Sequence, residues 1–148
     1  MSEAFDLESF LPYRLNRAAE LISVSFSKEY KQRFQMTRPE WRALAALGSA
    51  GRMTATEIGI HSNMHKTKVS RAVRDLEQRR WLRRQDNETD RRVEHLELTA
   101  QGQKAYREIA DLAHAYQAGI EKALGPGAIE RIEAGLADVE RALLTKRR

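Results

Sequence analysis

The residues with the clearest chemical potential are ten lysines and arginines gathered in residues 61–92, a segment that also holds five acids. The segment carries +5, the formal charge of the whole 148-residue chain, because residues 1–60 carry +1 and residues 93–148 carry −1. Eight of the ten cations are arginines, whose planar guanidinium can donate paired hydrogen bonds to phosphate. The segment favours contact with a nucleic acid, although a solvated charged face would have the same composition.

Other kinds of chemistry find little support. The chain has no cysteine, which excludes disulfides, thiolate zinc sites and thiol nucleophiles. His61 and His65 are four residues apart, a spacing that can bind metal on one helix, but Asn63 interrupts the segment and no His-Glu-x-x-His arrangement is present. Glycine-rich phosphate loops and Gly-x-Ser-x-Gly elbows are also missing from the sequence. We therefore expect neither an enzyme nor a bound cofactor or metal.

The sequence also argues against a membrane protein. Its longest purely apolar run, Ala43 to Leu47, is far shorter than the roughly 20 residues that span a bilayer. The first ten residues contain three acids and no base, unlike a signal peptide. We expect a soluble cytoplasmic protein in a reducing compartment.

Apolar spacing and helix caps predict the elements that position the cations. A long helix is expected from about Ser9 to Gln32 or Phe34, and the capping boxes at Thr37–Glu40 and Thr54–Glu57 open two more. A break at residues 61–63 precedes a helix over residues 66–80, where an apolar stripe leaves the cations on polar faces. Two short helices around a tight break predict a helix-turn-helix. The apolar stripe of the first helix is Leu11, Leu15, Ala18, Ile22 and Phe26, and that of the helix over residues 66–80 is Val69, Val73 and Leu76.

The following segments predict a β-hairpin and two long helices. Residues 81–84 and 93–98 have strand character, and the polar residues 85–90 between them are expected to form a loop. Thr99 is a plausible N-cap for a helix that ends at Gly125-Pro126-Gly127. A last helix then repeats apolar residues in steps of three and four, the spacing of a helix–helix seam: Ile129, Ile132, Leu136, Val139 and Leu143.

Three segments together resemble the MarR family of bacterial transcription regulators. Lys66-Thr67-Lys68-Val69-Ser70-Arg71 is similar to the recognition helix of that family, and Asp86 through Asp90-Arg91-Arg92 is similar to its wing tip. Leu98-Thr99-Ala100-Gln101-Gly102 is similar to the Leu-Thr-x-x-Gly that closes the wing. One departure is Arg80 before Trp81, where the family usually has glycine; arginine tolerates a left-handed helix end less well.

The resemblance implies a mainly α fold with a small β-hairpin wing, in which a winged helix-turn-helix core is flanked by long N- and C-terminal dimerisation helices. It predicts one domain over residues 1–148, with the DNA-binding core at about 36–100 and the dimerisation helices at about 7–34 and 101–147. The alternative for the flanking apolar stripes is packing within one subunit.

The implied function is a sequence-specific regulator of transcription that binds a double-stranded, pseudo-palindromic operator as a homodimer. The recognition helix would enter the major groove and the wing the adjacent minor groove, where Asp90 would orient a neighbouring arginine. Repression with ligand-triggered release is the expected mode; an activator of the same fold and a non-specific architectural protein remain alternatives. The predicted DNA contacts are Lys66, Thr67, Lys68, Ser70, Arg71, Arg74, Arg84, Asp90, Arg91 and Arg92.

The family also commonly binds a small aromatic carboxylate or phenol between the dimerisation helices and the winged domain. Arg14 and Arg17 are flanked by apolar residues on the first helix, which suits paired hydrogen bonds to a carboxylate. The alternatives are that these arginines pair with acids and that Trp41 belongs to the core. The predicted ligand-binding residues are Tyr13, Arg14, Arg17, Trp41, His61 and His65.

Overall fold

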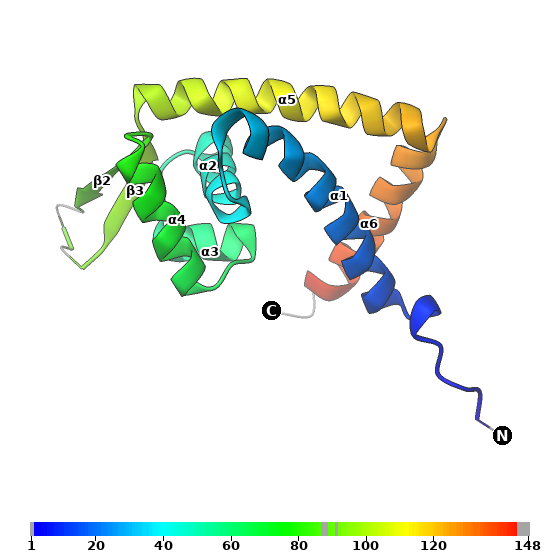
Figure 1. Cartoon of the computed structure of the whole chain (residues 1–148). Coiled ribbons are helices and arrows are strands. Elements are labelled where there is room, and N and C mark those ends of the chain that lie inside the picture. Colours follow the sequence, from blue (N-terminus) through cyan, green and yellow to red (C-terminus); the bar gives the residue numbers. More distant parts are fainter. Residues whose placement is uncertain (1, 87–88, 91, 145–148) are drawn as a thin grey trace. The chain divides into compact units, whose positions relative to one another are not determined.

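The computed structural model describes residues 2–86, 89–90 and 92–144. The chain divides into two compact units, Met1–Ala110 and Asp111–Arg148, and the boundary falls inside α5. Figure 1 labels the helices α1 to α6 and the strands β2 and β3. The elements are a short 3-10 helix at Leu7–Ser9, α1 Leu11–Phe34, α2 Arg38–Ala50, β1 Met53–Thr54, α3 Ala55–Ser62, α4 Lys66–Gln78, β2 Leu82–Asp86, β3 Glu94–Leu98, α5 Ala100–Leu124 and α6 Ala128–Leu144.

The fold class is confirmed: the described residues are mainly helical, with a small antiparallel sheet in the first unit. The core of that unit forms around the predicted α4 stripe, whose side chains are buried together with apolar side chains of α2, α3 and the strands. Burial of this stripe fixes which face of α4 points outward. The largest fully buried aliphatic side chains of these elements are Leu44, Leu47, Ile58, Val69, Val73, Leu76 and Leu96.

The two predicted capping boxes are confirmed. Thr37 Oγ1 accepts the backbone N–H of Glu40 at 3.3 Å, and Thr54 Oγ1 accepts that of Glu57 at 3.1 Å. Each bond satisfies one N–H group that a helix start leaves without an intrahelical partner. Asn63 ends α3 in the left-handed conformation, so the helix includes His61 and Ser62, the first two residues of the break expected at 61–63, and the break itself falls at Asn63.

The sheet differs from the predicted hairpin in two respects. A third strand, β1, pairs with β3 through Met53↔Leu96 and gives the strand order β1-β3-β2. In addition, Gln85 and Asp86 belong to β2, where the prediction had a loop, because they pair with His95 and Glu94. Residues 87 and 88 of the predicted loop lie outside the described residues.

The helix-to-wing turn explains the departure at Arg80. The N–H of Trp81 donates to Leu76 O at 3.0 Å and that of Arg80 to Glu77 O at 2.9 Å, the bond pair of a Schellman helix end. This end places Arg80 in the left-handed region, at φ 65°. The expected backbone conflict is therefore present, because a side chain at this φ costs about 1–2 kcal/mol.

We expect Arg80→Gly to stabilise the protein by about 0.5–1 kcal/mol, because relief of the left-handed strain exceeds the entropy cost of glycine. Urea unfolding followed by circular dichroism measures the change. Gln78→Gly, two residues earlier at the last position of α4, should instead destabilise the protein by about 1 kcal/mol. Equal losses for both variants would contradict the assignment of strain to Arg80.

The wing is closed at its root by Thr99. Its N–H donates to Trp81 O at 2.9 Å, and its hydroxyl donates to Arg80 O at 2.6 Å. The same hydroxyl accepts the N–H of Gly102 at 3.1 Å, which confirms Thr99 as the cap of α5. Leu82 pairs with Leu98 beside it. One threonine therefore joins the first strand of the wing to the start of the next helix.

In the second unit, α6 keeps the predicted apolar stripe and α5 is separated from it by Gly125-Pro126-Gly127. Both glycines have left-handed φ values, 93° and 77°, which glycine adopts readily. None of the helices among the described residues has the length and apolar content to cross a membrane. The single domain over 1–148, with a core at about 36–100, stays a prediction.

Candidate nucleic-acid interface

The exposed side of α4 carries the predicted DNA contacts. Val69, Ala72, Val73 and Leu76 face the core, so the helical period turns the polar side chains away from it. Lys66, Lys68, Arg71 and Arg74 are the four cations on this side, and none of them is in an ion pair with an acid among the described residues. The exposed set is Lys66, Thr67, Lys68, Ser70, Arg71 and Arg74.

Two hollows flank the N-terminal half of α4. One, of about 450 Å³, lies toward α3 and is lined in part by Ile60, Met64 and Ser70. The other, of about 280 Å³, lies toward the start of α2 and is lined in part by Pro39 and Thr67. A helix about 10–12 Å across with free space on both sides fits a DNA major groove about 12 Å wide.

The remaining arginines of the basic segment are mostly neutralised. Strand alternation puts Arg83 opposite Glu97, and their charged groups lie 2.7 Å apart. Arg84, on the other face, is 3.0 Å from Glu77 of α4 and 3.1 Å from Glu94 of β3. Arg84, which was predicted to bind DNA, has two carboxylate partners within the protein, and its contact with DNA stays a prediction. Among the described residues of the basic segment, the cations without an ion pair are Arg80 and the four on the exposed side of α4.

At the wing, Asp90 holds Arg92. Asp90 Oδ1 accepts the backbone N–H of Arg92 at 3.0 Å and its side-chain Nε at 3.2 Å. These two bonds lower the pKa of the Asp90 carboxyl below its usual value, so the bonds persist at neutral pH and are lost as the pH falls through that lowered pKa. The Arg92 side chain is 92% exposed and is available to DNA. Arg91 lies outside the described residues.

We expect Arg92→Ala to weaken DNA binding by more than about 1 kcal/mol and Asp90→Ala to weaken it in the same direction by a smaller amount. Asp90→Ala removes a negative charge, so a model of bulk charge alone predicts tighter binding; loss of the ordered Arg92 predicts the opposite. Fluorescence anisotropy with a labelled duplex distinguishes them. Asp138→Ala, which removes an acid paired with Arg141 on α6, is the control and should leave affinity unchanged.

The predicted ligand residues fall into different surroundings. Arg17 is paired with Glu8 at 2.8 Å near the start of α1, one of the alternatives foreseen. Trp41 packs against Phe26 and Tyr30, with ring centroids 5.2 and 5.8 Å apart. Since Phe26 is nine residues beyond Arg17 on α1, the two stand about 13 Å apart along the helix axis. Tyr13 and Arg14 lie near Arg17 on α1, His61 on α3, and His65 at the N-cap of α4 lining the hollow toward α3.

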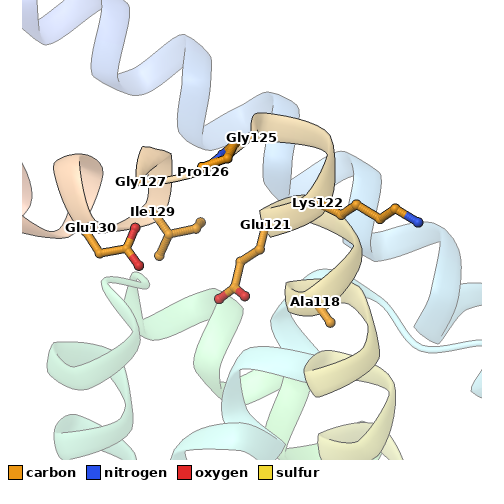
Figure 2. Close-up of a pocket in the computed structure, with 8 residues that line it drawn as sticks. All are labelled: Ala118, Glu121, Lys122, Gly125, Pro126, Gly127, Ile129 and Glu130. Atoms are coloured by element: carbon orange, nitrogen blue, oxygen red, sulfur yellow. The ribbon is translucent and has the colours of Figure 1, made fainter.

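A separate hollow in the second unit lies at the turn between α5 and α6 and has a volume of about 520 Å³. Figure 2 shows Glu121 and Glu130 on its lining, with the Lys122 side chain extending away from them. Acidic lining disfavours a carboxylate ligand, and none of the predicted ligand residues lies there. The Gly-Pro-Gly sequence marked the turn but gave no sign of the hollow.

A helix-turn-helix with an exposed cationic second helix, followed by a hairpin with an ordered arginine, defines a winged-helix DNA-binding protein. The comparisons agree. A model of the MarR family matches residues 34–93, and the uncharacterized HTH-type transcriptional regulator YwoH of Bacillus subtilis is 31% identical over 99 residues, which cover 67% of this chain and 71% of YwoH. The chain belongs to the MarR family.

Solved structures share the fold. The structure of Bordetella bronchiseptica BpsR, whose DNA binding is regulated by 6-hydroxynicotinic acid, has a TM-score of 0.79 at 18% identity and covers 93% of this chain and 98% of its own. NadR in complex with 4-hydroxyphenylacetate has a TM-score of 0.76 at 21% identity and covers 93% and 97%. Because the family consists of DNA-binding transcriptional regulators, this protein is a regulator of transcription and not an enzyme.

Proposed function

We propose that this regulator is a homodimeric repressor that binds a pseudo-palindromic DNA operator in the cytoplasm and is released by a small aromatic carboxylate or phenol. The observation that carries the DNA-binding part is the set of unpaired cations on α4. Lys66, Lys68, Arg71 and Arg74 bind phosphates and base edges of the major groove, and Thr67 and Ser70 supply short hydrogen-bonding groups.

The wing binds the adjacent minor groove. Arg92, ordered by Asp90, and Arg91 next to it enter the groove, where the negative potential is strong. Arg84 contributes to this contact only by giving up one of its two ion pairs, with Glu77 or Glu94. Its main contribution is then to hold β2 and β3 against α4.

Exposed apolar stripes support the homodimer. In the first unit Leu11 and Ile22 of α1 are 57% and 46% exposed, and in the second unit Ile132 and Leu136 of α6 are each 44% exposed. Exposed apolar side chains repeated along one side of a helix favour a protein–protein interface. A two-fold dimer presents two α4 helices to half-sites about 34 Å apart. Sedimentation equilibrium should give a dimer at micromolar concentration, and a monomer would reject this part.

The effector proposal rests on the aromatic acids named with the two ligand-regulated or ligand-bound relatives of the same fold. In this chain Arg14, with no acidic partner among the described residues, is the first candidate for the carboxylate, and Arg17 follows if it leaves Glu8. Tyr13, Trp41, His61 and His65 are the candidates for ring contacts.

The function is tested with a duplex selected by the protein from random DNA. A regulator should prefer that duplex over random competitor by about 10³-fold or more, and equal affinity would favour an architectural protein. For the effector, aromatic acids are screened by thermal shift, since a ligand at 100 times its Kd adds about 2.7 kcal/mol. Arg17→Ala should keep DNA affinity and lose ligand-induced release; normal release would remove Arg17 from the site.

A further inference from the structure

The long helix α1 packs against the winged core, here residues 38–98, through side chains of its C-terminal part, and Glu20 in its N-terminal half adds an ion pair with Arg38 at 2.9 Å. Its buried residues are Phe26, Ser27 and Tyr30, whereas Leu11, Leu15 and Ile22 in the N-terminal half are exposed. The proposed dimer surface of α1 and its attachment to the DNA-binding elements therefore lie in different parts of one helix. Contacts at the end of α1 link α4 to that surface, and the Glu20–Arg38 ion pair links the start of α2 to it.

Arg79, at the C-cap of α4, makes a direct polar contact between α4 and the end of α1. Its Nη1 donates to Phe34 O at 2.8 Å and its Nη2 to Gln35 O at 2.9 Å. These carbonyls are at the end of α1, where helical C=O groups lack intrahelical partners and the helix dipole favours a cation. Both nitrogens of the guanidinium fork are thus used on α1.

The third nitrogen of Arg79 contacts α2. Arg79 Nε lies 3.0 Å from Glu40 Oε2, and Glu40 is only 5% exposed. The guanidinium also lies over the Trp81 ring at 5.0 Å, and Trp81 meets Phe34 edge to face at 6.0 Å. The Arg79 side chain therefore contacts the end of α1, the start of α2 and Trp81, the residue directly before β2. A lysine in its place has a point charge and cannot reach these partners with a planar fork.

We propose that Arg79 is the positioning residue that sets the angle of α4 and the wing relative to α1, and with it the spacing of DNA half-sites that the dimer accepts. The inference rests on the proposed homodimer. Arg79 need not touch DNA to do this, because its effect passes through α4. One added base pair moves the second half-site by about 3.4 Å and turns it by about 35°. A rigid α1–α4 connection therefore lowers DNA affinity for each base pair added or removed between the half-sites.

The test uses full-length protein and a duplex selected by the wild type from random DNA, from which variants are made with one or two base pairs added or removed between the half-sites. Affinities are measured by anisotropy for the wild type, Arg79→Lys and Glu40→Gln. Arg83→Lys is the matched control, because Arg83 also pairs with a glutamate but lies on β2. Sedimentation is run on each protein.

For the wild type and Arg83→Lys we expect a loss of at least about tenfold per added base pair. For Arg79→Lys and Glu40→Gln we expect losses within about threefold across the spacings, with unchanged base preference inside each half-site. Spacing profiles as steep as that of the wild type would overturn the positioning role. If Arg79→Lys fails to fold, the spacing profile of Glu40→Gln tests the positioning role. If both variants fail to fold, the Arg79–Glu40 pair contributes to folding stability alone, which also overturns the proposal. A monomeric or spacing-indifferent wild type would instead reject the proposed dimer.

Discussion

Gly102→Ala is expected to destabilise the protein by about 3 kcal/mol or more, the upper range of overpacking. A Cβ on Gly102 would lie 2.0 Å from Trp81 O and 2.9 Å from Trp81 C. Both atoms belong to the backbone, so no rotamer change relieves the clash. Trp81 O also accepts the N–H of Thr99, and moving it would open the root of the wing. Urea unfolding measures the loss.

Two other glycines provide controls for Gly102→Ala. Gly119 lies in α5 and Gly135 in α6, and a Cβ at either position meets nothing within 4 Å. Alanine there should stabilise the protein by up to about 1 kcal/mol, the difference in helix propensity. If Gly102→Ala lowered the free energy of unfolding by less than the experimental error of the two control measurements, the close approach of the Trp81 backbone would not explain why glycine stands at position 102.

DNA affinity is expected to fall about 10³–10⁵-fold between 50 and 200 mM salt if the dimer neutralises 6–10 phosphates. The unpaired α4 cations supply this effect, because binding by each one releases counterions from the DNA. Arg71→Gln should reduce the slope of log affinity against log salt by about 1.8, since a dimer loses two contacts at about 0.9 each. Anisotropy titrations at several salt concentrations give the slopes.

The matched control for the salt experiment is Arg83→Gln. Arg83 lies in the same basic segment but is 2.7 Å from Glu97, so it has no free charge to offer DNA and its removal should leave the slope within about 0.3 of the wild type. Equal changes for the two variants would mean that bulk charge, and not the exposed face of α4, governs binding. A flat response of the wild type would exclude the phosphate contacts altogether.

Local spacing was sufficient to predict the helices. The capping boxes and the stripe of Val69, Val73 and Leu76 depend on residues three or four apart, and such patterns act within one element. Arg80 was also singled out, because the family that the sequence resembles usually has glycine at this position and glycine suits a left-handed helix end. The identity of the fold followed from the order of these local features.

The sequence did not reveal features that depend on long-range pairing. β1 has two residues and forms because Met53 pairs with Leu96, and Gln85 and Asp86 become strand only through β3. The charge count likewise placed ten cations in one segment but could not tell Arg71 from Arg83, because the neutralising Glu97 is brought near by strand register. The contact of Arg79 with Phe34 links residues 45 positions apart, beyond the reach of any local pattern.

The closed root of the wing has a consequence for how such regulators diversify. Thr99 and the Leu82–Leu98 pair tie the two ends of the hairpin together before the chain reaches the tip. A loop whose ends are already joined can be lengthened cheaply, about 0.6 kcal/mol for each doubling. Insertions or exchanges between the strands therefore leave the core and the start of α5 undisturbed. Variation is confined to the connection between β2 and β3, because Leu82, Leu96 and Leu98 of the strands belong to the core; through that connection related regulators can acquire new operators.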